Sequence, residues 1–158
     1  TGIMIAGRGH PIDRVVSDFT AGAVEEMLLE IGNDHDLLVV EGQGSIVHPA
    51  YSAVTCGILH GAMPDAMVLC HAADRAVIHG YESVSLPSIA EYVDLYESLA
   101  APVHNAEVVA GALNTSDIDR EDDARAAIDA YADELDAPAT DVVRFGAEEI
   151  LDAVRGGV

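Results

Sequence analysis

Lysine and tryptophan are absent from this 158-residue chain, and its seven basic residues are all arginine. Against them stand 28 acidic residues, which give a formal net charge of -21. Nucleic acid needs basic patches on its protein partner, so this composition argues against nucleic-acid binding. The missing lysine also excludes a complete Walker A phosphate-binding loop within the chain, because that loop requires one.

The excess of acid repels itself at ordinary ionic strength, whereas molar salt shortens the screening length to about 3 Å. The composition therefore predicts a protein of a salt-loaded, halophilic cytoplasm. The chain also has no apolar run of the roughly 18 residues that a membrane-spanning helix needs. No charged leader followed by an apolar segment opens it. We therefore expect a cytoplasmic protein without a membrane partner.

Half of the residues are apolar, which favours one globular domain with a core at this length. Helical and strand-like patterns alternate along the chain, as is typical of a parallel sheet with crossover helices. The expected strands cover residues 37–41, 66–70, 108–113 and 140–143. The expected helices cover residues 14–31, 50–60, 89–99 and 120–135, with Asp13 and Asp119 as caps, and a last helix contains Ile150, Leu151 and Val154. We predict a single α/β domain over residues 1–158.

The most informative segment is the apolar run 37–40, which leads into Glu41 and a glycine-punctuated turn. Such a run predicts a buried parallel strand, and ligands bind beyond the carboxyl ends of such strands. A carboxylate at that end binds Mg²⁺ or accepts a proton. The alternative is an acid that caps a helix or pairs with an arginine. Gly42 and Gly44 allow close approach of the backbone to a ligand.

Ser45, His48 and Tyr51 follow in the same segment. A serine hydrolase would pair Ser45 with His48, but the G-x-S-x-G pattern of such enzymes is not met. We favour side chains that donate hydrogen bonds to a polar or anionic ligand. The alternative is that His48 only stabilises the turn before the next helix.

Other motifs fail on their spacing. The chain has neither a C-x-x-C nor an H-x-x-x-H pair for zinc, and no complete G-x-G-x-x-G for a dinucleotide. Asn114 ends a predicted strand, where it can read the edge of an adenine or serve as an ordinary turn residue. Arg8 and Arg14 are candidates for a substrate carboxylate, or for ion pairs with surface acids.

Several segments resemble P-loop NTPase-like proteins that have long been catalogued as a domain of unknown function, a family that includes D-glutamate N-acetyltransferase. The segments that carry the resemblance are Thr1–Gly7, Asp18–Glu25, Glu41–Tyr51, Gly61–Asp65, Ala112–Thr115 and Pro138–Arg144. Together they span nearly the whole chain, and Glu41–Tyr51 is the most specific of them. Because the family carries a P-loop with its lysine upstream of this region, the chain is similar to the C-terminal part of such a protein.

The resemblance implies a three-layer, mainly parallel sheet related to dethiobiotin synthetase. It implies that Glu41 faces Mg²⁺ or acts as a base, with Ser45 and His48 as further catalytic candidates. The implied acceptor-binding residues are Thr1, Gly2, Arg8, Gln43 and Tyr51. The implied nucleotide-binding residues are Gly42, Gly44, Asn114, Asp141 and Arg144.

As a function, the resemblance implies N-acetylation of a small acidic amino acid, with acetyl-CoA or ATP as the adenine-containing ligand and Mg²⁺ as a candidate metal. Two alternatives remain: an ATP- and Mg²⁺-dependent ligase like dethiobiotin synthetase, and a non-catalytic nucleotide-binding module. Relatives of this sheet type commonly pair, so a homo-oligomer is a further expectation.

Overall fold

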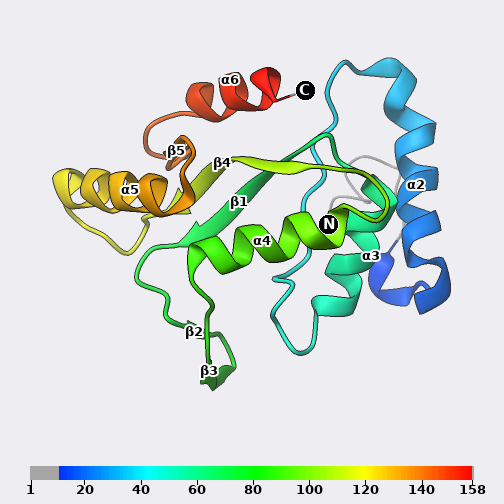
Figure 1. Ribbon diagram of the computed structural model, residues 1–158, viewed down its shortest axis with the longest axis horizontal. Coiled ribbons are helices and arrows are strands. Elements are labelled where there is room, and N and C mark those ends of the chain that lie inside the picture. Colours follow the sequence, from blue (N-terminus) through cyan, green and yellow to red (C-terminus); the bar gives the residue numbers. More distant parts are fainter. Residues whose placement is uncertain (1–10, 158) are drawn as a thin grey trace. The chain divides into compact units, whose positions relative to one another are not determined.

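The computed structural model describes residues 11–157 (Figure 1). By its internal contacts the chain divides into two compact units, Thr1–Met63 and Pro64–Val158, and each is described by itself. The prediction of a single domain stays a prediction. In the described part of the chain, no helix is both long and apolar enough to cross a membrane.

The first unit is built on two helices that pack against each other. Its elements are η1 (Ile12–Arg14), η2 (Ser17–Phe19), α2 (Thr20–Ile31), η3 (Gly32–Asp34) and α3 (Ser52–Ala62). The helices approach closely because Gly61 carries no side chain: a Cβ there would lie 2.8 Å from the Cβ of Val24, which is buried. This contact packs the C-terminal turn of α3 against α2.

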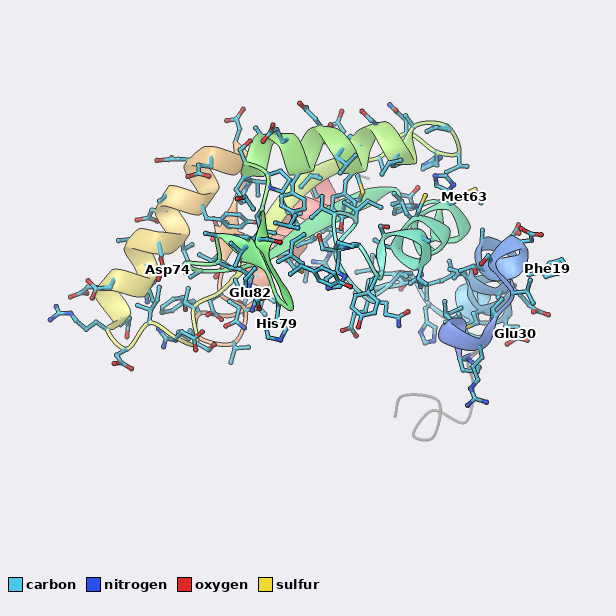
Figure 2. The ribbon with its side chains drawn as sticks, turned by 90° about the horizontal axis from the view of Figure 1, so that it is seen from below. Phe19, Glu30, Met63, Asp74, His79 and Glu82 are labelled. Carbon is cyan, nitrogen blue, oxygen red and sulfur yellow. The ribbon has the colours of Figure 1, made fainter. Side chains whose placement is uncertain are left out.

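Two predictions for this unit are wrong. The helix that Asp13 was expected to cap begins only at Thr20, after two short 3-10 turns, and Phe19 is 67% exposed, with its side chain pointing away from α2 (Figure 2). The expected buried strand over residues 37–40 is irregular backbone, and Val39 is 88% exposed. A strand needs a hydrogen-bonded neighbour, and no described strand pairs with this run.

The second unit contains a parallel sheet in the strand order β1-β4-β5. Its elements are β1 (Ala66–Ala72), β2 (Val77–Ile78), β3 (Tyr81–Ser85), α4 (Ile89–Ala100), β4 (Glu107–Asn114), α5 (Glu121–Leu135), β5 (Ala139–Thr140) and α6 (Glu148–Gly156). The pairing of β1 with β4 runs from Ala66 opposite Glu107 to Ala72 opposite Asn114, with one irregularity near Met67. The predicted α/β fold with a mainly parallel sheet is confirmed.

Helices cover both faces of this sheet. The buried core lies between the sheet and two helices on one face, α4 and α5, and its members are Ile89, Leu113, Ile128, Tyr131, Leu135 and Ala139. Figure 1 shows α6 on the opposite face from α4. The predicted three layers are therefore present in this unit.

Three details of the second unit differ from expectation. The strand that was expected over residues 140–143 is β5, which covers only Ala139–Thr140, and residues 142–145 form a turn. Arg120, not Asp119, occupies the N-cap position of α5, and its side chain does not cap the helix. Three acidic residues in the first turn interact favourably with the positive end of the helix dipole instead. A short antiparallel hairpin of β2 and β3, which carries His79 and Glu82, had no clear signal because every residue of β3 is exposed (Figure 2).

Candidate functional site

The described candidate residues fall into two groups, one in each unit. The 41–52 loop holds Glu41, Gly42, Gln43, Gly44, Ser45, His48 and Tyr51. The strand-end loops, residues 114–118 and 141–145, hold Asn114, Asp141 and Arg144. Thr1, Gly2 and Arg8, which were predicted to bind the acceptor, lie outside the described residues.

The 41–52 loop is fastened to the first turn of α3. The buried hydroxyl of Thr55 donates to the carbonyl oxygen of Gly44 at 2.8 Å and faces that of Tyr51 at 3.2 Å. Gly44 is required here because a Cβ would lie 2.9 Å from the Cβ of Tyr51. This glycine therefore serves the packing of the loop on its own helix.

His48 stabilises the turn that precedes α3. Its Nδ1 accepts a hydrogen bond from the backbone N–H of Ala50 at 3.1 Å, and its ring stacks on Tyr51 with the centroids 4.3 Å apart. An acceptor role for Nδ1 means that the neutral ring carries its proton on Nε2. His48 thus presents a donor, which suits a carboxylate ligand better than the deprotonation of a serine.

Ser45 has a similar local role. Its Oγ accepts a long hydrogen bond from the backbone N–H of Val47 at 3.4 Å, and its carbonyl oxygen accepts from the N–H of His48 at 3.0 Å. Glu41, Gly42 and Gln43, in contrast, are exposed at the start of the loop. The loop therefore has a fixed part near α3 and an open part that begins with the carboxylate.

In the second unit the strand-end loops lie at one edge of the sheet. The strands β1, β4 and β5 are parallel, so their carboxyl ends meet at the same edge. The N–H of Ala73, just after β1, donates to the carbonyl oxygen of Asn114 at 3.0 Å. The structure therefore brings Asn114, Asp141 and Arg144 together at the edge where ligands bind in sheets of this type.

Asp141 is the centre of this arrangement. Its carboxylate, in a residue only 4% exposed, accepts from the N–H and hydroxyl of Thr115 at 2.9 and 2.6 Å. It also accepts from the N–H groups of Val143 and Arg144 at 3.0 and 3.2 Å. Burial alone raises the pKa of Asp141, but these hydrogen bonds outweigh it and hold the pKa below its usual value of 3.8.

The amide of Asn114 has a defined orientation. Its Oδ1 accepts from the N–H of Ser116 at 2.9 Å, so the Nδ2 donor is turned away from the loop backbone. The guanidinium of Arg144 donates to the carbonyl oxygen of Ile118 at 2.6 Å. The two strand-end loops are therefore joined at two places, through Asp141 and through Arg144.

His71 also lies near this edge of the sheet, at the end of β1. Burial lowers its pKa, and the nearby Arg75 lowers it further, while Glu134 acts in the opposite direction. Its ring stacks on Tyr131 at a centroid distance of 5.9 Å. This half-buried imidazole is therefore neutral at neutral pH and packs beside the core.

Sequence reasoning missed Thr115, whose side chain is fully buried at 0% exposure. The signal was present, because Thr115 follows an apolar strand directly and Asp141 follows the next strand of the sheet. Only the strand order, in which β4 and β5 are neighbours, makes these two residues partners. Sequence spacing alone does not contain that order.

The described residues do not form a metal site from protein ligands alone. Within the described part of the chain, no three His, Cys, Asp or Glu side chains gather to form a metal-binding group. Mg²⁺ usually keeps several waters and is held by one or two carboxylates together with substrate phosphates. The exposed carboxylate of Glu41 suits that mode, and it would then hold the ion jointly with a ligand.

Comparison with known proteins gives a match over most of the chain. The model of a family described as "Domain of unknown function (DUF1611_C) P-loop domain" matches residues 1–151. A crystal structure of a DUF1611 family protein from Anabaena variabilis superposes with a TM-score of 0.93 at 41% identity, covering 99% of this chain and 46% of that one.

Two curated relatives carry a functional name. A protein of Tritonibacter scottomollicae named D-glutamate N-acetyltransferase is 37% identical over 98% of this chain and 46% of its own length. A protein of Pseudoalteromonas sp with the same name is 35% identical over 95% of this chain and 45% of its own length. The chain thus spans about half the length of the curated relatives it matches.

Proposed function

Because this chain belongs to the DUF1611 P-loop domain family, we propose that the complete gene product is an acetyltransferase that moves an acetyl group from acetyl-CoA to the amino group of D-glutamate. The observation that carries the proposal is the similarity of almost the whole chain to two relatives with that name. The described loops supply side chains whose chemistry suits each half of the reaction.

Transfer of the acetyl group requires a free amine. The amine nitrogen forms a bond to the thioester carbonyl carbon, the carbon–sulfur bond breaks, and the amine proton must leave while the CoA thiolate is released. The exposed carboxylate of Glu41 is our candidate for accepting that proton. Alternatively, the same carboxylate would hold Mg²⁺, which would supply positive charge to stabilise the phosphate groups of the ligand.

The acceptor carries two carboxylates and therefore needs hydrogen-bond donors. The Nε2–H of His48 and the amide of Gln43 are candidates in the 41–52 loop, with Ser45 and Tyr51 as further neighbours of the acceptor. Thr1, Gly2 and Arg8 complete the proposed acceptor set. The adenine-containing donor is assigned to the strand-end loops, where Asn114 presents a fixed amide donor and Arg144 a cation.

The test is a release assay on the complete gene product in molar salt. Incubation with acetyl-CoA should release free CoA thiol with D-glutamate and much less with L-glutamate as the control. Mass spectrometry should identify N-acetyl-D-glutamate as the product. The proposal fails if the protein binds neither acetyl-CoA nor D-glutamate under these conditions.

A second candidate is an ATP- and Mg²⁺-dependent ligase, which the P-loop in the family description favours. The same assay separates the two, because a ligase releases ADP from ATP in the presence of the acceptor and leaves acetyl-CoA intact. A non-catalytic nucleotide-binding module would bind ADP yet release neither ADP from ATP nor CoA from acetyl-CoA.

A further inference from the structure

A groove of about 420 Å³ lies along β5, which is the edge strand of the described sheet. Figure 1 shows β5 between α5 and α6, and residues of all three elements line the groove. Its volume is typical of small-molecule sites. Asn114, Asp141 and Arg144 do not belong to the described lining, so the groove is separate from the residues assigned to the adenine-containing ligand.

Part of the lining of the groove is apolar. Ile128 and Ala139 belong to the buried core, and the half-buried ring of Phe145 packs against that core. A ligand with an apolar body would lose its contact with water on these side chains, which favours binding. The groove therefore suits a ligand that is not only a small ion.

The charged part of the lining is mainly acidic. Asp129 on α5 and Glu148 and Glu149 on α6 bring three carboxylates, which form no ion pair with a described residue. Arg125 also lines the groove, but its Nε and Nη2 donate to Oε1 of Glu121 at 3.1 and 2.8 Å. Its guanidinium lies 3.9 Å from the centroid of an aromatic ring in the lining. Because this arginine is already engaged, the groove favours a cationic ligand.

Thr140 gives an independent indication of a ligand. This residue is only 6% exposed and lines the groove, and its hydroxyl makes no hydrogen bond with a described residue. No fully buried side-chain oxygen or nitrogen of the described residues lacks a partner, so the hydroxyl must reach accessible space, and the groove is the space that Thr140 lines. A nearly buried polar group is costly without a partner. An N–H group of a ligand would supply that partner.

We propose that this groove binds an aliphatic diamine. The methylene chain lies on the apolar lining, while the ammonium groups donate to the carboxylates of α5 and α6 and to the hydroxyl of Thr140. Carboxylates on two different helices suit a ligand that carries a cation at each end. The site does not depend on the proposed acetyl transfer, because it uses none of the residues assigned to that reaction.

The test is calorimetry with 1,4-diaminobutane on the complete gene product in molar salt. Under this condition charges are screened beyond about 3 Å, so attraction to the net charge of the whole chain is suppressed. 1,4-Butanediol has the same methylene chain without the charges and should bind at least about tenfold more weakly. Mg²⁺ at equal concentration should not displace the diamine. Displacement by Mg²⁺ would show that the carboxylates act alone, and it would overturn the proposal.

Variants locate the binding. Glu148→Gln combined with Glu149→Gln should weaken diamine binding about tenfold. The matched control is Asp133→Asn combined with Asp152→Asn, which removes two charges from α5 and α6 outside the groove and should change the affinity less than about twofold. Thr140→Val should weaken binding about threefold, and Thr140→Ser should restore it. Circular dichroism confirms that each variant measured is folded.

Two further results would overturn the proposal. A wild-type protein that binds no diamine has no such site. A control variant that loses as much affinity as the groove variant would show diffuse attraction to an acidic surface. A Thr140→Val protein with wild-type affinity would overturn the assignment of the hydroxyl. Acetyl transfer is measured on the same samples without diamine, so these results and a failure of the proposed function are distinguishable.

Discussion

The 41–52 loop and the strand-end loops both carry candidate functional residues, but they are held in different ways. In the 41–52 loop the fixed contacts are local, such as the bond from Thr55 to Gly44. In the strand-end loops the bonds join residues far apart in sequence, as Thr115 and Asp141 do. The comparison indicates that α3 stabilises the 41–52 loop. The strand order of the sheet, in contrast, determines which residues of the two strand-end loops are bonded to each other.

The largest effect on the strand-end loops is expected when the carboxylate of Asp141 is removed. Asp141→Ala leaves the two donors of Thr115 and the N–H of Val143 without their acceptor, whereas the N–H of Arg144 keeps its bond to the backbone carbonyl oxygen of residue 141. We expect the free energy of unfolding to fall by about 3 kcal/mol, because buried unpaired donors are costly. Urea unfolding in constant molar salt measures this change.

The matched control is Asp133→Ala on the exposed side of α5, which removes the same charge from the same unit. That variant should differ from the wild type by less than about 0.5 kcal/mol. Equal effects of the two substitutions would show that net charge, and not the buried bonds, controls the stability of the unit.

A smaller effect is expected in the 41–52 loop from Gly44→Ala. The added Cβ would lie 2.9 Å from the Cβ of Tyr51 and 3.3 Å from its ring, so the loop must shift away from α3. We expect a loss of about 2 kcal/mol, as overpacking usually produces. Gly42→Ala is the control, because a Cβ there meets nothing within 4 Å. If both variants unfold alike, the close contact is not what fixes the loop.

Acid provides a third, still smaller perturbation, and comparison of the wild type with Asp141→Asn isolates its effect on the strand-end loops. The pKa of Asp141 is lower in the folded protein than its usual value of 3.8, so its stabilisation is complete above that pH and is lost as the pH falls through the folded pKa. The difference in unfolding free energy between wild type and Asp141→Asn should therefore be constant from pH 7 to about 4.5 and shrink below about 3.8. A difference that stays constant down to pH 2.5 would contradict the lowered pKa.

Local patterns predicted much of this fold and less of the site. The strands at residues 66–72 and 107–114 and the helix at residues 89–100 follow from apolar periodicity, which needs no knowledge of neighbours. The run 37–40 has the same apolar pattern as a buried strand, yet its backbone is irregular. Apolar content identifies a segment that can pair, whereas pairing itself depends on a partner strand that the pattern does not contain.

The candidate site, like the fold, could be predicted from local patterns only in part. Asn114 was identified because a polar residue at the end of a predicted strand is a local signal, whereas Asp141 was named only through the family resemblance. The link between them through Thr115 depends on β4 and β5 being neighbours, which is a property of the whole sheet. Likewise, the roles of His48 and Gly44 in the turn before α3 depend on the position of that helix.

The smallest effect on stability is expected at Glu41 in the 41–52 loop. A substitution there tests the function of the loop and not its stability. The side chain of Glu41 is exposed, so Glu41→Gln should change the unfolding free energy by less than about 0.5 kcal/mol, as should the control Glu30→Gln on α2. If Glu41 accepts the amine proton, the same substitution should lower the rate of acetyl transfer by about 100-fold, while Glu30→Gln leaves it unchanged. A carboxylate that holds Mg²⁺ would instead make the loss of rate depend on the Mg²⁺ concentration. A Glu41→Gln protein with the full wild-type rate would remove the open part of the 41–52 loop from the chemistry and leave that loop a structural element of the first unit.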